Sequence, residues 1–448
     1  MYPKNLSKHY FQIKDGGIKI FMKKINTLIF IIFIKLPVYF ISIPIFIILT
    51  LIRPWYLIRW KELNSSRLGE FAMESELYCC ERDANINFPK QKYKDFFYLK
   101  DYICNKTIEK MWRRKITILP RTFIKPIHDI GNFFLGKNNI HEIKNPIRND
   151  RDFYNLLEKF ETHVNFTSKQ ELKGKEILKI LGLPKNSKFV CLIVRDRGYL
   201  SRYENIQSGE RWRYHDYRDG DIENYVMATE ELAKRGYYVF RMGINVLKPL
   251  KSANPKIIDY ANSEIRSDFM DVYLGANCSF CISTACGFDA IPHLFRKPIA
   301  TITVPMGTFW TTNQNFLLLT KHHINRLTKK ELSISEIFSS KAALTFYDEE
   351  FKDINVELQE NTPEEIKDLV TEMDERISGS WKETEEDLLL QKKFWHIFED
   401  NMKKLIILEP ENPTHRLLSQ LKVTYDVKKE HGAKFSSNFL KNNLDFIQ

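Results

Sequence analysis

The sequence predicts an α/β protein with two Rossmann-like lobes, preceded by an N-terminal apolar segment. Strand-length apolar runs alternate with helical patterns beyond residue 188, as in a doubly wound parallel sheet. The 448 residues exceed one ordinary core. One long apolar stretch, residues 25–52, stands apart from both lobes. The expected parts are a basic tail (1–24), a membrane-associated segment (25–52), an N-terminal lobe (53–184), a C-terminal lobe (185–345), and C-terminal helices with a tail (346–448).

The apolar segment favours attachment to a membrane surface. Residues 25–52 exceed the roughly 20 needed to cross a bilayer, but Lys35 and two prolines interrupt them. Basic residues flank the segment on both sides, so the positive-inside rule selects no orientation. We therefore expect a kinked segment that enters one leaflet with both ends cytoplasmic. Trp55, Tyr56 and Trp60 would then lie at the level of the headgroups.

The composition narrows the class of partner. A formal charge of +11 and a pI near 9.0 favour anionic partners such as a nucleotide diphosphate or anionic lipid. The basic residues are dispersed and no nucleic-acid-binding motif is present, so we expect no nucleic-acid partner. The seven cysteines suit buried free thiols in a reducing compartment. Cys278 and Cys281 lie on an apolar strand without a second pair, which disfavours a zinc or redox site.

The predicted N-terminal lobe begins with a short strand at residues 56–58. A turn follows, and a helix then continues through Tyr78. Arg67 and Glu70 lie in that turn, where they are either site residues or an exposed cap and a capping-box acid. Helical periodicity returns at residues 153–181, and the Gly-Pro turn after it is the expected lobe boundary.

The predicted C-terminal lobe begins with a continuous apolar run at residues 189–194, typical of a parallel strand buried on both faces. That strand delivers Arg195 and Asp196 to its carboxyl end, the edge where open α/β sheets bind ligands. A second strand, residues 237–240, delivers Arg241 to the same edge. These charged residues are therefore candidates for ligand binding.

Residues 266–305 hold the most informative pattern. In order, they predict a helix capped by Ser267 or Asp268, a strand at 278–283, a turn at 283–287, a helix at 288–295 and a strand at 299–304. The turn contains Ser283, Thr284 and Gly287, and free backbone N–H groups at a helix N-terminus form a ready anion site. The alternative is an ordinary turn whose hydroxyl groups only cap the helix.

Two later patterns predict helix starts. Thr362, followed by proline and two glutamates, has the features of an N-cap with acids in the first turn. Thr384 is followed by acids in the same way. The polar stretch from Glu411 is expected to be a partly ordered tail.

The 266–305 stretch resembles the donor-binding motif of the fucosyltransferase-like GT-B glycosyltransferases, in which a helical Asp is followed by an apolar strand and a Ser/Thr-rich loop. Asp271 and Ser283-Thr284 stand at those places. Most of residues 52–448 resembles a bacterial glycosyltransferase family associated with surface-polysaccharide loci. The matching pieces are Arg67–Glu70, Val190–Asp196, HDYRDGDIENY from His215, Arg241–Gly243, residues 266–305 and TPEEI from Thr362. One departure is Ile193, which stands where the fucosyltransferase-like enzymes have a histidine two residues before the arginine.

The resemblance implies a GT-B-like fold with an acceptor-side N-terminal lobe and a nucleotide-sugar-binding C-terminal lobe. It implies an inverting, metal-independent glycosyltransferase that moves a hexosyl or deoxyhexosyl group from a nucleotide-diphosphate donor to a lipid-linked or surface glycan. The expected location is the cytoplasmic face of a bacterial inner membrane, peripheral or anchored by the N-terminal segment.

Glycosyl transfer requires neutralisation of the leaving diphosphate. Arginine suits this task, because its planar guanidinium binds phosphate oxygens in pairs and stays charged. Arg195 and Arg241 are the principal candidates. The resemblance assigns Asp271 to the ribose or base, and the alternative is an acid that faces a helix dipole. The expected substrate-binding residues are Arg67, Arg195, Asp196, Arg218, Asp221, Arg241, Asp268, Asp271, Ser283, Thr284 and Gly287.

An acceptor hydroxyl must also lose a proton. The candidate catalytic bases are Glu70, His215 and Asp216, and Asp221 is a further possibility. A histidine in a loop can instead be exposed and idle. The choice stays open at this point.

The metal-binding pattern of other glycosyltransferases, Asp-x-Asp, occurs at residues 150–152 and 219–221. Such pairs arise by chance in a chain of this composition, so we expect neither a metal nor another cofactor. Two other functions fit less well. The first is a non-catalytic, membrane-tethered glycan- or nucleotide-binding protein, and Ile193 is the feature in its favour. The second is another nucleotide-sugar enzyme such as an epimerase, which would not require the apolar segment.

Overall fold

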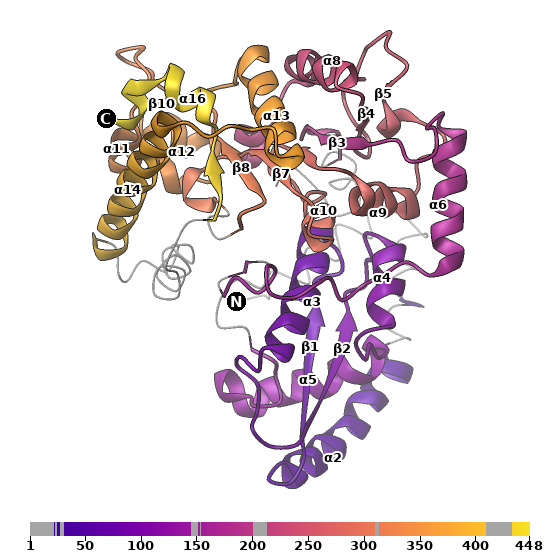
Figure 1. Cartoon of the computed structure of the whole chain (residues 1–448). Coiled ribbons are helices and arrows are strands. Elements are labelled where there is room, and N and C mark those ends of the chain that lie inside the picture. Colours follow the sequence, from indigo (N-terminus) through magenta and orange to yellow (C-terminus); the bar gives the residue numbers. More distant parts are fainter. Residues whose placement is uncertain are drawn as a thin grey trace. The chain divides into compact units, whose positions relative to one another are not determined.

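The computed structural model describes residues 22, 25–26, 31–144, 151–152, 154–199, 213–309, 313–408 and 432–448. The basic tail therefore lies almost entirely outside the described residues. The chain forms two compact units (Figure 1). The first comprises Met1–Asn64, Phe88–Tyr102 and Arg113–Lys144, and the second comprises Ser65–Asn87, Ile103–Trp112 and Asn145–Gln448. This division differs from the predicted lobes, which were separated at residue 184.

The first unit contains a small parallel sheet. Strands β1 (Leu57–Leu63) and β2 (Tyr93–Leu99) pair along their whole length, beginning with Leu57 opposite Tyr93. Single parallel bridges, Trp60 to Glu142 and Phe97 to Ile118, extend the sheet on its two sides. The unit also contains the π-helical turn η1 (Ile31–Lys35) and helices α2 (Leu36–Ile52) and α5 (Arg121–Leu135).

Aromatic packing connects α2 to the core of this unit. Phe46 of α2 meets the indole ring of Trp60 edge to face, with ring centroids 6.5 Å apart. The imidazole ring of His141 stacks on the same indole ring, with ring centroids 5.1 Å apart. Trp60 is only 1% exposed, so its expected place among lipid headgroups is wrong, because the indole fills the unit's own core. Trp55 and Tyr56 are exposed. Among the described residues, no helix has both the length and the apolar character needed to traverse a membrane.

The second unit is built on a seven-stranded sheet in which every neighbouring pair is parallel. Its strands are β3 (Phe189–Ile193), β4 (Tyr238–Arg241), β5 (Ile257–Ile258), β6 (Cys281–Ser283), β7 (Ile299–Ile302), β8 (Phe316–Leu319) and β11 (Lys434–Phe435). The spatial order is β11-β8-β7-β6-β3-β4-β5. From β5 to β8 this is the Rossmann strand order, and the winding direction reverses between β3 and β6. The prediction of a parallel α/β sheet is confirmed.

The second unit also contains helices, most of which are labelled in Figure 1. They are α3 (Leu68–Asp83), α4 (Lys106–Arg113), α6 (Ser168–Ile180), α8 (Val226–Lys234), α9 (Asp268–Asn277), α10 (Ala290–Leu294), α11 (Ile334–Ser339), α12 (Asp348–Asp353), α13 (Pro363–Ser378), α14 (Glu385–Leu408) and α16 (Ser437–Asn442). A separate antiparallel pair joins β9 (His322–Asn325) to β10 (Val356–Gln359).

The predicted helix starts have clear local causes. Ser267 caps α9 by accepting a hydrogen bond from the Met270 N–H. Thr362 and Glu365 form a reciprocal capping box at the start of α13, and Gly379 ends that helix in the left-handed region at φ 76°. Thr384 likewise accepts a hydrogen bond from a backbone N–H of α14.

Two predicted helices are shorter in the structure. The helix expected at residues 288–295 is α10, with five residues, and the pattern at 153–181 becomes helical only in α6. The predicted tail is partly outside the described residues. Its last part adds β11 to the sheet edge and packs α16 against α13 and α14.

Candidate functional site

A cavity of about 480 Å³ opens in the second unit where the carboxyl ends of β3 and β6 meet. This is the point at which the strand order reverses, and open α/β sheets bind their ligands in such crevices. The walls come from the start of α3, the residues after β3, the 3-10 helix η3 (Arg213–Arg218), the turn after β6, and the region after β7. All of these segments belong to one compact unit.

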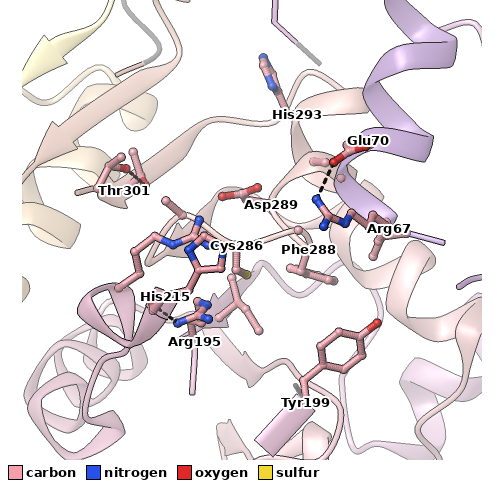
Figure 2. A pocket seen from close by; sticks show the side chains of 18 of the residues that line it. Arg67, Glu70, Arg195, Tyr199, His215, Cys286, Phe288, Asp289, His293 and Thr301 are labelled. Carbon is pink, nitrogen blue, oxygen red and sulfur yellow. Dashed lines mark hydrogen bonds and ion pairs between the residues drawn. The ribbon is translucent and has the colours of Figure 1, made fainter. Parts of the chain in front are cut away.

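Four arginines line this cavity, and they come from four separate segments. They are Arg67, Arg151, Arg195 and Arg218. Figure 2 shows Arg67 and Arg195 among the lining side chains. Arginine stays charged at physiological pH, so these side chains bring four positive charges to the cavity, beside four acids that also line it. Of the four, the sequence identified all but Arg151.

Arg195 is held at the end of β3. Its backbone N–H donates to Thr284 Oγ1 at 2.8 Å, and its guanidinium donates to the His215 carbonyl oxygen at 2.9 Å. The guanidinium also forms an ion pair with Asp219. These contacts fix the orientation of Arg195, and removing it would leave the partly buried Asp219 with the more distant Arg197, at 3.8 Å, as its ion-pair partner.

Arg67 lies directly before α3 and forms an ion pair with Glu70 at 3.0 Å. Its side chain is about half exposed, unlike that of Arg195. The start of α3 comes close to the turn after β6, because a Cβ built at Gly69 would lie 3.4 Å from Gly287 Cα. Arg67 and Glu70 therefore line the same cavity as Gly287.

The hydroxyl groups of the turn after β6 are used to hold the turn together. Ser283 Oγ accepts a hydrogen bond from the Ala285 N–H at 3.0 Å and donates to Asp289 Oδ2 at 2.9 Å. Thr284 accepts the backbone hydrogen bond from Arg195. Ser283 and Thr284 are both buried. The part of this turn that lines the cavity is residues 285–289. With a following helix of only five residues, the anion-binding character of this site rests mainly on the arginines.

Asp289 is the most prominent lining residue that sequence reasoning missed. Burial raises the pKa of its carboxyl group to about 6, while the Ser283 hydrogen bond and the charges of Arg151 and Arg218 oppose the shift. An acid just before a short helix is easily interpreted as a cap, so the sequence carried little signal for it. Arg151 is the middle residue of the Asp-x-Asp pattern at residues 150–152, which draws attention to its two acids and not to the arginine.

Histidines in and beside the cavity are held neutral. Burial, together with the charges of Arg218, Arg195 and Arg67, lowers the pKa of His215 to about 3. His293 on α10 is buried, and burial also lowers its pKa to about 3. The low pKa of His215 makes its imidazole a weak base near neutral pH.

Asp271 lines the cavity from α9. It is nearly buried and forms an ion pair with Arg266 at 2.6 Å. Burial raises the pKa of its carboxyl group to about 6, and Arg266 opposes that shift. Asp268, one turn earlier, does not line the cavity. Its carboxylate instead accepts a hydrogen bond from the Lys106 N–H at 3.1 Å.

Several other predicted residues lie outside the lining. Arg241 is 1% exposed and lies between Asp196 and Asp259, at 3.6 and 3.5 Å. Asp196 itself does line the cavity. Asp216 forms an ion pair with Arg197 at 3.1 Å, outside the lining.

Asp221, also outside the lining, is paired with Lys248 at 2.7 Å. The other acid of this Asp-x-Asp pattern, Asp219, forms an ion pair with Arg195. Of the other pair, Asp152 is described, and its carboxylate accepts hydrogen bonds from the Leu156 and Leu157 N–H groups.

Within the described residues, one cluster could offer three metal ligands, namely Glu76, Cys80 and His163. Arg296 donates to Glu76 and lies 3.9 Å from the Cys80 sulfur. A guanidinium thus already supplies the positive charge there, and the cluster is an ion-pair network.

The chain was compared with known proteins. No protein-family model matches it, and no curated protein matches it. Solved structures similar to it include a glycosyl transferase family 9 protein from Veillonella parvula, with a TM-score of 0.38 and 9% identity over 59% of this chain and 86% of that one. The E. coli ADP-heptose lps heptosyltransferase II gives 0.33 and 9% over 55% and 84%. The E. coli heptosyltransferase WaaC with ADP-2-deoxy-2-fluoro heptose gives 0.29 and 11% over 58% and 93%. None of these three is a fucosyltransferase, so that resemblance stays a prediction.

Proposed function

We propose that this chain transfers a sugar from a nucleotide-diphosphate donor to a hydroxyl group of a lipid-linked or surface glycan. The observation that carries the proposal is the convergence of four arginines on one cavity at the reversal point of a Rossmann-type sheet. The cavity volume is within the range of small-molecule and cofactor sites, about 300 to 1,000 Å³.

The arginines suit the diphosphate group of the donor. Each guanidinium can donate two parallel hydrogen bonds to phosphate oxygens without losing its charge. Three of them, Arg67, Arg195 and Arg218, already lower the pKa of His215, which supports a positive potential in the cavity. Asp271 offers carboxylate oxygens that can accept hydrogen bonds from the hydroxyl groups of a ribose.

Asp289 is the residue that we assign as the general base. Of the four acids that line the cavity, Glu70, Asp196 and Asp271 form ion pairs with arginines, whereas Asp289 accepts a hydrogen bond from the Ser283 hydroxyl. A carboxyl group with a pKa near 6 is largely ionised at neutral pH and still able to accept a proton. We prefer it to the sequence candidates His215, Glu70 and Asp216 for this reason.

In the proposed step, the acceptor oxygen forms a bond to the anomeric carbon of the sugar. The bond from that carbon to the diphosphate oxygen breaks, and its electron pair leaves with the nucleoside diphosphate. The acceptor proton passes to Asp289. The arginines neutralise the leaving charge, so the proposal includes metal independence and, because displacement is direct, inversion at the anomeric carbon.

The proposal is tested by incubating the purified full chain with a panel of nucleotide sugars and measuring release of nucleoside diphosphate. A glycosyltransferase releases the diphosphate slowly with water and faster with a glycan acceptor. An epimerase instead yields an isomeric nucleotide sugar without release, and a binding protein yields neither product. Either of these two results would replace the proposed function.

A further inference from the structure

We propose that helices α2 and α5 of the first unit form a face that docks onto a membrane surface carrying anionic lipid. This inference is independent of the chemistry in the second unit. It rests on how α2 is packed, on what its other side exposes, and on the charges at its two ends.

One side of α2 packs against the core of the first unit. Tyr39, Ser42, Phe46 and Leu49 recur at helical spacing and face α5 and the sheet, with Phe46 packed on Trp60. The Tyr39 hydroxyl donates to Asp129 of α5. Figure 1 shows the two helices side by side. The helix is therefore a structural part of the unit and cannot leave it without opening the core.

The opposite side of α2 exposes large apolar side chains. Among the described residues of η1 and α2, those at least half exposed are Phe33, Phe40, Ile41, Ile47, Ile48 and Leu51. Phe40 is 70% exposed. Single exposed apolar residues are ordinary on soluble proteins, but a helix that is apolar on both sides indicates a partner for its outer side.

Helix α5 and the chain just after α2 also expose aromatic side chains. Phe133 and Phe134 are 83% and 64% exposed, and their rings contact each other edge to face at 5.2 Å. Phe123 is also exposed, and Trp55, just after α2, is 75% exposed. The apolar sequence pattern at residues 25–52 did not identify the phenylalanines of α5, because they lie far along the chain.

The helix geometry favours partial insertion parallel to the surface. Its 17 residues span about 26 Å, less than the hydrocarbon thickness of about 30 Å. With one side fixed on α5, the outer side can enter the boundary between headgroups and acyl chains, as interfacial amphipathic helices do.

The basic residues near α2 favour anionic lipid over a second copy of the chain as the partner of this face. Lys35 lies at the start of α2 and Arg53 follows its end, and both are exposed. Lys137 and Lys144 of the same unit are exposed as well. Two copies meeting through this face would bring like charges together, in a chain with a formal charge of +11, whereas anionic headgroups would attract them.

The test is co-sedimentation of the full chain with vesicles of phosphatidylcholine alone and of phosphatidylcholine mixed with phosphatidylglycerol. We expect binding to the mixed vesicles, with affinity falling about fivefold for each basic residue removed, as in Lys35→Gln and Arg53→Gln. The double variant Phe133→Ser/Phe134→Ser should lose at least about tenfold in affinity, because two exposed rings no longer enter the lipid.

A matched control is Leu388→Asn/Leu389→Asn, which removes two exposed apolar side chains from α14 of the second unit and should leave vesicle binding unchanged. The phenylalanine pair is preferred to changes in α2 because it lies at the surface, and thermal unfolding of each variant checks that it folds. The proposal is overturned if the phenylalanine variant binds like the parent, or if both vesicle types bind equally. It is also overturned if the parent does not bind vesicles and instead forms a dimer that the phenylalanine variant dissociates.

Discussion

The replacement Asp289→Asn tests the proposed base most sharply. It removes the ability of the side chain to take a proton while keeping its size and an oxygen for the Ser283 hydrogen bond. A positioned general base typically contributes about 10² to 10⁴ in rate. We therefore expect release of nucleoside diphosphate to slow by that factor. Binding of the nucleoside diphosphate should not weaken, because Asp289 contributes no positive charge to the cavity.

The pH dependence gives a second readout of the same group. The pKa of Asp289 is raised to about 6, and the carboxylate must be ionised to act, so kcat/KM should fall about tenfold per pH unit below about pH 6. Ser283→Ala removes a hydrogen bond that stabilises the carboxylate, and should move this limb upward by about 0.7 unit for a bond of about 1 kcal/mol. The matched control is Glu70→Gln, which should leave the limb in place. A full rate in Asp289→Asn, or an unchanged acidic limb in that variant, would refute the assignment.

Two further predictions concern metal and stability. Nucleoside diphosphate release should survive EDTA, because arginines neutralise the leaving group, and a loss restored by Mg²⁺ or Mn²⁺ would reopen the case for Asp219 and Asp221. Burial lowers the pKa of His293 to about 3, so between about pH 6.5 and 3 the unfolded chain binds a proton there that the folded chain does not. As the pH decreases through this window, the free energy of unfolding should therefore decrease less in His293→Gln than in the parent. Chemical denaturation at pH 7 and pH 5 measures the difference.

The features of the fold and of the site that the sequence predicted are those fixed by local pattern. A continuous apolar run implies a buried parallel strand, which places the next residue, Arg195, at the ligand-binding edge. Thr362 carries its capping partners within three residues. Such features need no knowledge of distant contacts.

The parts that it missed depend on tertiary packing. Arg151, the middle residue of the Asp-x-Asp pattern at residues 150–152, lines the cavity only because of how its segment folds. Trp55 and Trp60 look alike beside an apolar segment, but the pleat of β1 turns Trp60 into the core. The direction of the Ser283 hydroxyl depends on Asp289, and Arg241 is enclosed by acids from two other segments.

The central claim is that the cavity of the second unit binds a nucleoside diphosphate through its arginines. Calorimetric titration with a nucleoside, its monophosphate and its diphosphate tests it most directly, with Arg67→Gln and the control Arg197→Gln beside the parent. Both arginines are about half exposed and paired with an acid, but only Arg67 lines the cavity. We expect affinity to rise with each phosphate, and Arg67→Gln to weaken diphosphate binding by about 1.5 kcal/mol, roughly tenfold, while nucleoside binding and the Arg197→Gln variant stay unchanged. Equal affinity for nucleoside and diphosphate, or identical behaviour of the two variants, would contradict the claim.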